Sequence, residues 1–246
     1  MSIIIPTLNS SRYIDIILSF YRRHEVPVIV FVDDRSVDDT LSIVRRCVDD
    51  IRLIHNPGTV VEDLVPLMAK ACGTKWVLRI DDDELPSLAL LRFVEEVVEQ
   101  DAIAVYGFPR YQCAVSRDGR LMTHREISPI MCRQWRLFQP GQVHFRGSLH
   151  SSGLQHENQR DVAAPDLASH VHLDWAVHSS RERAQKLARY DAHTQNEGTK
   201  WRDFYLYEEG VTADAFVELA LPEFDETVRE IAERLGELCV ETEKTG

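Results

Sequence analysis

The first half of the chain alternates short apolar runs, rich in β-branched residues, with amphipathic stretches. This alternation is typical of parallel strands joined by crossover helices. The run 27–32 is apolar throughout, as expected of a strand that is covered on both faces. The strands predicted in this half cover residues 3–5, 27–32, 51–55, 76–80 and 103–108.

Amphipathic segments between these strands predict helices. After Asn9 or Ser10, either of which can cap a helix, apolar residues recur at three- and four-residue spacing through Phe20. The segment 36–39, Ser-Val-Asp-Asp, has the form of a capping box and predicts the start of a second helix. Further helices are predicted over 61–72, after Pro86, over 180–194 and within 222–240.

The pattern changes after residue 108. The segments 111–116 and 120–123 flank Asp118-Gly119, and an Asp-Gly pair supplies the positive φ angles of a tight hairpin turn. From 132 to 178 no period dominates, and Gln, His, Gly and Ser are frequent. We expect irregular, substrate-facing loops there.

Composition narrows the class of protein. Of 246 residues, 44% are hydrophobic and 28% are charged, and 28 Lys and Arg against 40 Asp and Glu give a net charge of −12. Because phosphate backbones require clustered basic residues, we expect no nucleic-acid partner. Five widely spaced cysteines without a C-x-x-C pair predict free thiols. With no signal segment and no apolar run of membrane-spanning length, we expect a cytoplasmic protein without a transmembrane segment.

Acidic residues directly follow two of the predicted strands. In open α/β sheets, ligands gather at the carboxyl ends of strands. Asp81 and Asp83, one residue apart at such a point, can hold Mg²⁺ or Mn²⁺, which prefer oxygen ligands and often bind substrate phosphates as well. A solvated acidic loop is the alternative. At the end of the second strand, Asp33 and Asp34 can offer a carboxylate to a ribose hydroxyl or a base N–H.

Three other groups of residues have simpler interpretations. Six histidines lie between 144 and 178, but no H-E-x-x-H or comparable spacing occurs, so a zinc hydrolase is a weaker alternative. The aromatic residues of 201–207 can stack on a sugar, although packing is the expected role. The apolar stripe of 224–238 is expected to be core or the contact of a homodimer.

Three segments together resemble the family 2 glycosyltransferases. Residues 3–9, I-I-I-P-T-L-N, look like the family's first strand and donor loop, and residues 32–40, V-D-D-R-S-V-D-D-T, look like its V-D-D-x-S-x-D-x-T segment. Residues 76–84, W-V-L-R-I-D-D-D-E, look like the strand that ends in the D-x-D motif, and His172-Leu173-Asp174-Trp175 matches more weakly.

The resemblance implies a fold and a division of the chain. The fold is an α/β GT-A-like one, with a Rossmann-type, mostly parallel sheet flanked by helices. The glycosyltransferase domain is expected over 1–200. A helical C-terminal segment over 201–246 is expected to pack on that domain.

The resemblance also implies a reaction. A hexose is transferred from a nucleotide-sugar donor, with a UDP-sugar favoured, to a hydroxyl of a glycan, lipid-linked or small-molecule acceptor, with inversion expected. Departure of the nucleoside diphosphate develops negative charge, which Mn²⁺ or Mg²⁺ neutralises. The implied metal ligands are Asp81, Asp83 and His172, with His178 in reserve. The implied donor contacts are Pro6, Thr7, Asn9, Asp33, Asp34 and Asp82.

The sequence departs from the family at the expected general base. Many relatives have an acid directly after a histidine, whereas here His150 is followed by Ser151. We expect His150 itself, or Glu157, to accept the proton of the acceptor. The departure leaves open a catalytically inactive nucleotide- or glycan-binding subunit of the same fold. A sugar nucleotidyltransferase is the other alternative, although its glycine-rich N-terminal phosphate loop is missing.

Overall fold

The computed structural model describes residues 1–100, 104–145, 154–155, 160–207 and 215–240. The chain divides into two compact units: residues 1–110 and 130–170 form the first, and residues 111–129 and 171–246 form the second. The chain therefore contributes a short segment to the second unit, returns to the first unit, and then forms the rest of the second unit. The boundary expected near residue 200 stays a prediction.

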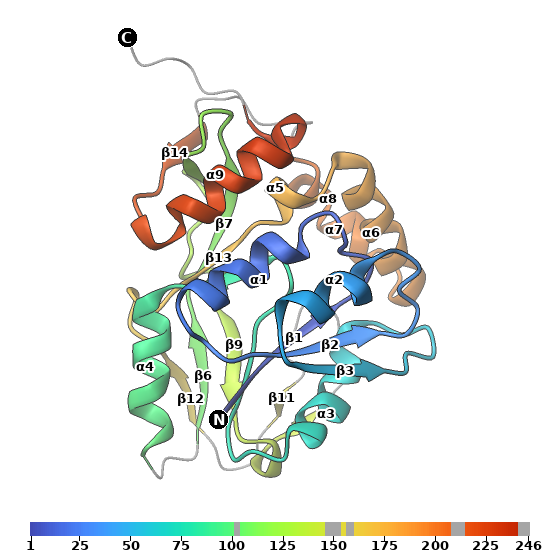
Figure 1. The fold of residues 1–246 in the computed structure, drawn as a ribbon, viewed down its shortest axis with the longest axis vertical. Coiled ribbons are helices and arrows are strands. Elements are labelled where there is room, and N and C mark those ends of the chain that lie inside the picture. The colour runs from blue at the N-terminus through green and yellow to red at the C-terminus, as the bar shows by residue number, and fades with distance from the viewer. Residues whose placement is uncertain (101–103, 146–153, 156–159, 208–214, 241–246) are drawn as a thin grey trace. The chain divides into compact units, whose positions relative to one another are not determined.

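A seven-stranded sheet in the order β12-β6-β9-β4-β1-β2-β3 forms the centre of the first unit (Figure 1). Its strands are β1 (Ser2–Thr7), β2 (Ile29–Asp33), β3 (Asp50–Ile54), β4 (Val77–Arg79), β6 (Ala104–Phe108), β9 (Gln134–Phe138) and β12 (Arg160–Ala163). All neighbouring pairs are parallel except those of β9, which runs antiparallel to β4 and β6. The mostly parallel α/β sheet predicted from the sequence is confirmed.

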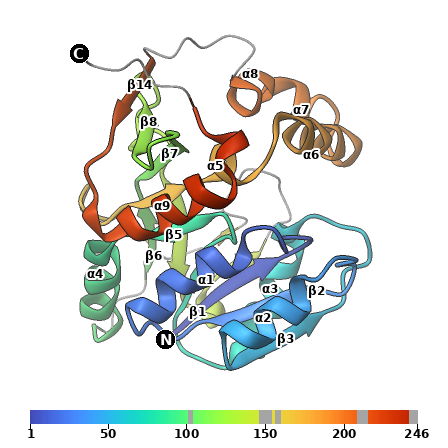
Figure 2. The ribbon, with the colours of Figure 1, turned by 45° about the horizontal axis from the view of Figure 1, so that its top comes forward.

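Helices cover both faces of this sheet. They are α1 (Ile14–Arg23), α2 (Thr40–Cys47), α3 (Val61–Cys72) and α4 (Leu88–Val98), the last preceded by the short strand β5 (Glu84–Pro86). α1 connects β1 to β2, and α2 connects β2 to β3. Because both connections move the chain in the same direction along the sheet, right-handed crossovers place the two helices side by side on one face (Figure 2). α3 leads back and packs Leu64 and Met68 against Ile4 and Phe31. The loops after β1, β2 and β4 consequently meet at one edge of the sheet.

The second unit is built on a small sheet in which β8 runs antiparallel to both of its neighbours. The predicted hairpin is formed by β7 (Arg110–Val115) and β8 (Leu121–His124), with Gly119 at φ 77° in its turn. β14 (Phe216–Glu218) pairs with β8, and β13 (His170–His172) lies next to β7. The helices are α5 (Asp174–Val177), α6 (Ser180–His193), α7 (Glu197–Lys200), α8 (Arg202–Tyr205) and α9 (Asp225–Arg234).

Aromatic side chains form much of the core of the second unit. Trp175 packs with Tyr207 and Phe216, and Tyr205 packs with Leu187. The aromatic residues of 201–207 therefore serve packing, as predicted.

Two expectations about local structure were wrong. Ser36 does not cap α2: the N-cap is Asp39, without a side-chain cap, and Ser36 Oγ instead accepts a hydrogen bond from Asn9 N at 3.3 Å. The described part of 132–178 is not irregular, since β9, β12 and β13 lie in it together with β10 (His144–Phe145) and β11 (Leu154–Gln155). β9 escaped detection because its buried face includes the charged side chain of Arg136.

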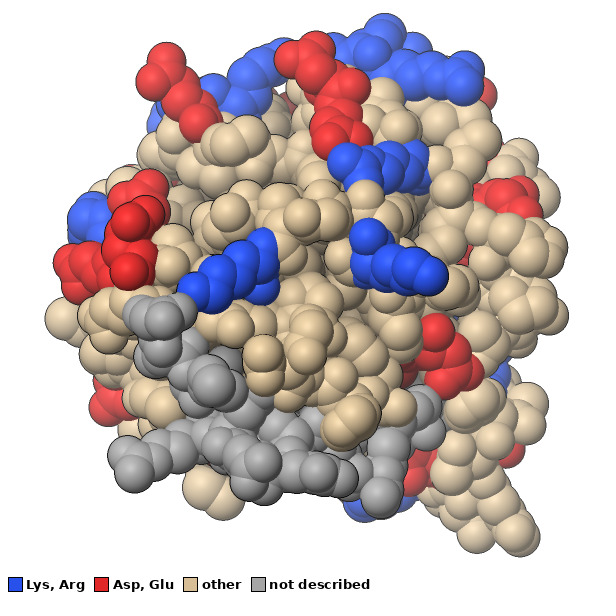
Figure 3. Space-filling view, turned by 90° about the horizontal axis from the view of Figure 1, so that it is seen from below, with Lys and Arg blue, Asp and Glu red and all other residues tan. Residues whose placement is uncertain are grey.

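The surface carries charges of both signs. On the face drawn in Figure 3, Lys and Arg side chains are interspersed with acidic and uncharged residues. Within the described ranges, no helix combines the length and the apolar character needed to cross a bilayer. The five cysteines are free thiols, as predicted.

Candidate active site

Side-chain hydrogen bonds join the loops that follow β1 and β4. Thr7, the last residue of β1, donates from Oγ1 to Asp82 Oδ2 at 2.7 Å, and the hydroxyl of Ser10 donates to the same oxygen. Thr7 and Ser10 are both buried. The carboxylate of Asp82 is therefore held at the sheet edge rather than left as a solvated acid. Pro6 lies one residue earlier, inside β1, opposite Phe31 of β2.

Asn9 joins the loop after β1 to the loop after β2. Its backbone is left-handed, at φ 54°, a conformation that Asn tolerates better than most residues. Its Oδ1 accepts a hydrogen bond from Val37 N at 2.8 Å, and the next residue, Ser10, donates from N to Thr40 Oγ1 at 2.7 Å. Three loops of the sheet edge are thus tied together through predicted donor-binding residues.

The two acids at the end of β2 have different surroundings. Asp33 is buried, and accepts hydrogen bonds from Arg35 (2.9 Å to Nη2) and from Asn56 Nδ2 (2.6 Å). Burial tends to raise the pKa of Asp33, but these hydrogen bonds outweigh burial and lower it. Asp34 is exposed, and its pKa is lowered by hydrogen bonds from the main chain of Asn56 and from His55. Asp34 is therefore an ionised carboxylate at the surface of this edge.

The acids after β4 are also unequal. Asp81 is bound by two arginines: Arg79 Nε lies 2.8 Å from its Oδ1, and Arg136 Nη2 lies 2.8 Å from its Oδ2. Asp83 is buried, with 5% of its surface exposed, and Glu84 is fully buried. Burial tends to lower the pKa of Arg136, but Asp81 and Glu84 outweigh burial and raise it. The negative charge of Asp81 is thus already compensated within the first unit.

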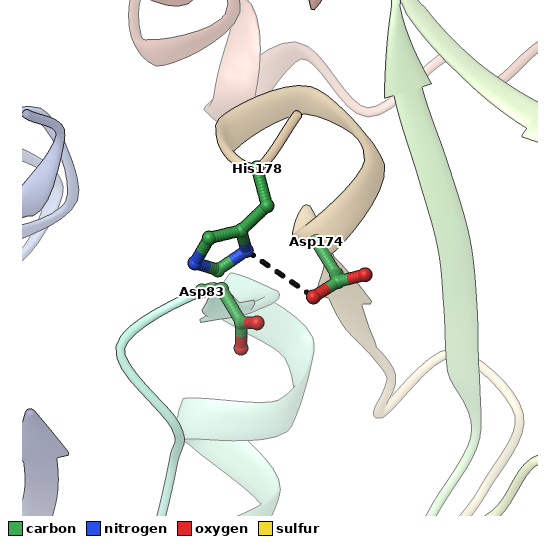
Figure 4. A group of neighbouring side chains, drawn as sticks. All are labelled: Asp83, Asp174 and His178. Carbon is green, nitrogen blue, oxygen red and sulfur yellow. Dashed lines mark ion pairs between the residues drawn. The ribbon is translucent and has the colours of Figure 1, made fainter. Parts of the chain in front are cut away.

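The second unit holds the predicted histidines. His172 is buried, with Nδ1 2.6 Å from Gln112 Oε1. His178 Nδ1 forms an ion pair with Asp174 Oδ1 at 3.2 Å (Figure 4), and Lys186 Nζ donates to the same oxygen at 2.9 Å. Burial tends to raise the pKa of Asp174, but Lys186 and His178 hold it well below its ordinary value.

One oxygen of this buried carboxylate is unsatisfied. Asp174 is fully buried, and its Oδ2 has no hydrogen-bond partner among the residues that the structure describes. A buried ionised oxygen without a donor is the kind of group that binds a cation.

No role was predicted from the sequence for Asp174, Lys186 or Arg136. Asp174 and His178 are four residues apart, one helical turn, and this spacing was a usable signal. Arg136 gave no local signal, because its partners lie more than 50 residues away. The predicted bases His150 and Glu157 lie outside the described residues, and their role stays a prediction.

Comparison with solved structures gives distant similarities. Residues 1–349 of S. aureus TarS are 17% identical, with a TM-score of 0.49, over 84% of this chain and 69% of that one. The same fragment in complex with UDP-GlcNAc gives 17% identity and a TM-score of 0.46 over 84% and 70% of the two chains. A 4-diphosphocytidyl-2C-methyl-D-erythritol synthase gives 19% and 0.37 over 57% and 74%. No curated protein matches the chain.

Comparison with protein families is decisive. The profile described as glycosyl transferase family 2 matches residues 2–155 of the 246, which include the three linked loops. The chain therefore belongs to glycosyl transferase family 2.

Proposed function

We propose that the chain transfers a sugar from a nucleoside diphosphate sugar, with a UDP-sugar favoured, to a hydroxyl of an acceptor. The observation that carries the proposal is the hydrogen-bonded edge where Thr7 and Ser10 hold Asp82, within the segment that the family profile matches. Ligands of open α/β sheets bind at this kind of edge. Here Asp34 supplies an exposed, ionised carboxylate for a ribose hydroxyl or a base N–H.

Each unit offers residues that suit a divalent metal ion. In the first unit, Asp83 offers a carboxylate. In the second unit, Asp174 and His178 offer a carboxylate and an imidazole, and the unsatisfied Oδ2 of Asp174 supports this assignment (Figure 4). When bound, Mn²⁺ or Mg²⁺ would neutralise the charge that develops on the departing diphosphate. Asp81 and His172 stay predicted ligands; the two arginines on Asp81 make it the weaker candidate.

The remaining step is removal of the proton from the acceptor hydroxyl, with inversion expected. That role belongs to His150 or Glu157 in our proposal. If neither serves, the chain is a binding subunit of the same fold. A sugar nucleotidyltransferase would instead release pyrophosphate from a nucleoside triphosphate and a sugar phosphate.

The test is a calorimetric screen of UDP-, GDP- and dTDP-sugars with and without Mn²⁺, with donor hydrolysis followed in the same samples. We expect Mn²⁺-dependent binding of one nucleotide class and slow hydrolysis. Binding without turnover in the presence of any acceptor would favour the inactive subunit. Pyrophosphate release would favour the nucleotidyltransferase, and no binding at all would exclude the proposed activity.

Asp83→Ala tests the metal ligand. We expect the Mn²⁺-dependent part of the donor affinity to fall by about 100-fold. Asp49→Ala is the matched control, since Asp49 is an exposed acid elsewhere on the first unit. Undiminished Mn²⁺-dependent affinity in Asp83→Ala would remove Asp83 from the site.

A further inference from the structure

A buried ionic cluster supports the acidic run after β4. Its basic members Arg79 and Arg136 each leave only 7% of their side chain exposed, and Glu84 leaves none. Charged side chains are rarely buried to this extent unless they are paired. Here Asp81 and Glu84 are the partners, and Arg110 adds a further contact at 3.6 Å from Glu84.

Arg136 links both ends of the acidic turn. Its Nη2 donates to Asp81 Oδ2 at 2.8 Å and to the two carboxylate oxygens of Glu84 at 2.8 and 3.0 Å. The turn also closes on itself. Glu84 N donates to the carbonyl oxygen of Asp81 at 3.0 Å, and Asp81 N donates to Glu84 Oε2 at 3.1 Å. One guanidinium on β9 therefore fixes both ends of a four-residue turn.

Asp82 and Asp83 lie between the two fixed ends. Asp82 is held in addition by the hydroxyls of Thr7 and Ser10. A turn that is anchored at both ends and bonded in the middle has little freedom to move. Preorganised carboxylates bind a donor and its metal without an ordering cost, and they hold the reacting groups in place.

A histidine lies next to the same carboxylate. His170 is fully buried, with Nε2 3.5 Å from Glu84 Oε1. The hydrogen bonds to the carboxylates come from the guanidinium groups. Of these, Arg136 makes hydrogen bonds to Asp81 and to Glu84 alike.

We propose that Arg136 is a positioning residue for the glycosyl transfer proposed above: it anchors Asp81 and Glu84 so that Asp82 and Asp83 stay at the donor site. This role rests on the proposed function. Arg136 acts through these carboxylates, because its own side chain is only 7% exposed and is paired with them.

The test compares wild type with R136Q, R136K and R133Q. Arg133 is the matched control, since its side chain is also largely buried, at 14% exposed. It donates to the carbonyl oxygens of Gly107 and Ala164 at 2.8 and 3.0 Å and, among the described residues, forms no hydrogen bond or ion pair with the acidic turn. Steady-state turnover is measured over a range of Mn²⁺ concentrations, and thermal unfolding gives the folded fraction of each variant.

We expect R136Q to lower kcat per folded molecule by about 100-fold, the loss that follows from a displacement near 1 Å. The half-saturating Mn²⁺ concentration should rise by about 10-fold, as when a group that orients metal ligands is removed. The KM for the donor at saturating Mn²⁺ should change little. R136K keeps the charge but lacks the rigid, planar guanidinium group that presents Nη2 to both carboxylates, so its kcat should lie between those of R136Q and wild type. R133Q should keep the wild-type kcat and Mn²⁺ dependence.

A merely structural role gives a different result. It would lower the unfolding temperature and the folded fraction, while kcat per folded molecule and the Mn²⁺ dependence stay at wild-type values. That result in R136Q would overturn the positioning role. If R136Q does not fold, the same result in R136K would overturn it. A loss of kcat in R133Q equal to that in R136Q would also overturn it. A wild-type protein that binds and turns over no nucleotide sugar would overturn the proposed function itself.

Discussion

Acidic loops follow β2 and β4, the two strands that flank β1, and their carboxylates are stabilised in different ways. After β2, Asp33 is paired with Arg35, only two residues along the chain, and the pair reaches solvent, since 38% of the Arg35 side chain is exposed. After β4, Asp81 is paired with Arg79, also two residues away, and in addition with Arg136, 55 residues away, and each of these arginine side chains is only 7% exposed. The pair after β2 is a local feature of one loop, whereas the pair with Arg136 ties a loop to a distant strand.

This contrast indicates which of the two acidic loops is more sensitive to substitution. A buried charge that loses its partner is left uncompensated in a medium that solvates it poorly, whereas solvent replaces much of what an exposed pair loses. The turn after β4 should therefore respond strongly to single substitutions. The loop after β2 should respond less strongly, because Arg35 reaches solvent although Asp33 itself is buried.

The largest effect is expected from Glu84→Gln. The substitution keeps the shape of the side chain but removes the charge that faces Arg136 at 2.8 Å. Breaking a buried pair by removal of one partner costs about 3–5 kcal/mol of stability. Urea unfolding at pH 7, followed by tryptophan fluorescence, measures the loss.

Glu62→Gln is the matched control for that experiment. Glu62 also faces an arginine, Arg79, but at 3.6 Å, and its side chain is 15% exposed. We expect a loss of less than about 1 kcal/mol. Equal stability of Glu84→Gln and wild type would mean that Glu84 carries no charge in the folded protein, and the contrast between the two loops would then disappear.

The same contrast explains which parts of the fold the sequence predicted. The stripe of α1, the hairpin turn at Gly119 and the helix that begins at Ser180 depend on residues a few positions apart, and all three are formed. β9 was missed because Arg136 occupies a buried position whose partners come from a remote loop. The prediction of a capping box at Ser36 was wrong, because the hydroxyl oxygen of Ser36 instead accepts a hydrogen bond from Asn9 N in the loop after β1.

The candidate site divides in the same way. The resemblance placed Thr7, Asn9 and Asp82 together, and the structure links their loops by hydrogen bonds. It could not show that Asp81 is engaged by two arginines, because one of them lies far along the chain. A motif gives the identity of the acids, whereas the environment that sets their charge depends on the tertiary fold.

An intermediate effect is expected from Asp33→Asn. The substitution weakens charge-assisted hydrogen bonds from Arg35 and Asn56, worth about 1–2 kcal/mol at pH 7. The pKa of Asp33 is lowered in the folded protein, so its stabilisation is present above the unfolded pKa of about 3.9 and is lost as the pH falls through the folded value. The stability difference between wild type and Asp33→Asn should therefore shrink below about pH 4. A difference that is constant from pH 7 to pH 3 would show that the charge of Asp33 contributes nothing.

The smallest effect on stability is expected from His55→Ala, which tests the exposed part of the loop after β2. His55 Nδ1 lies 2.6 Å from Asp34 Oδ2, but 81% of the His55 side chain is exposed, so the unfolding temperature should not change. The main-chain N–H of Asn56 lowers the pKa of Asp34 more than His55 does, so loss of the imidazole should raise that pKa only slightly. An NMR titration of the Asp34 carboxyl measures the shift, with Asp118 as the internal reference, because its pKa is lowered by Ser116 and Arg120 far along the chain from His55. Return of the Asp34 pKa to its ordinary value would show that the single side chain of His55 controls this pKa.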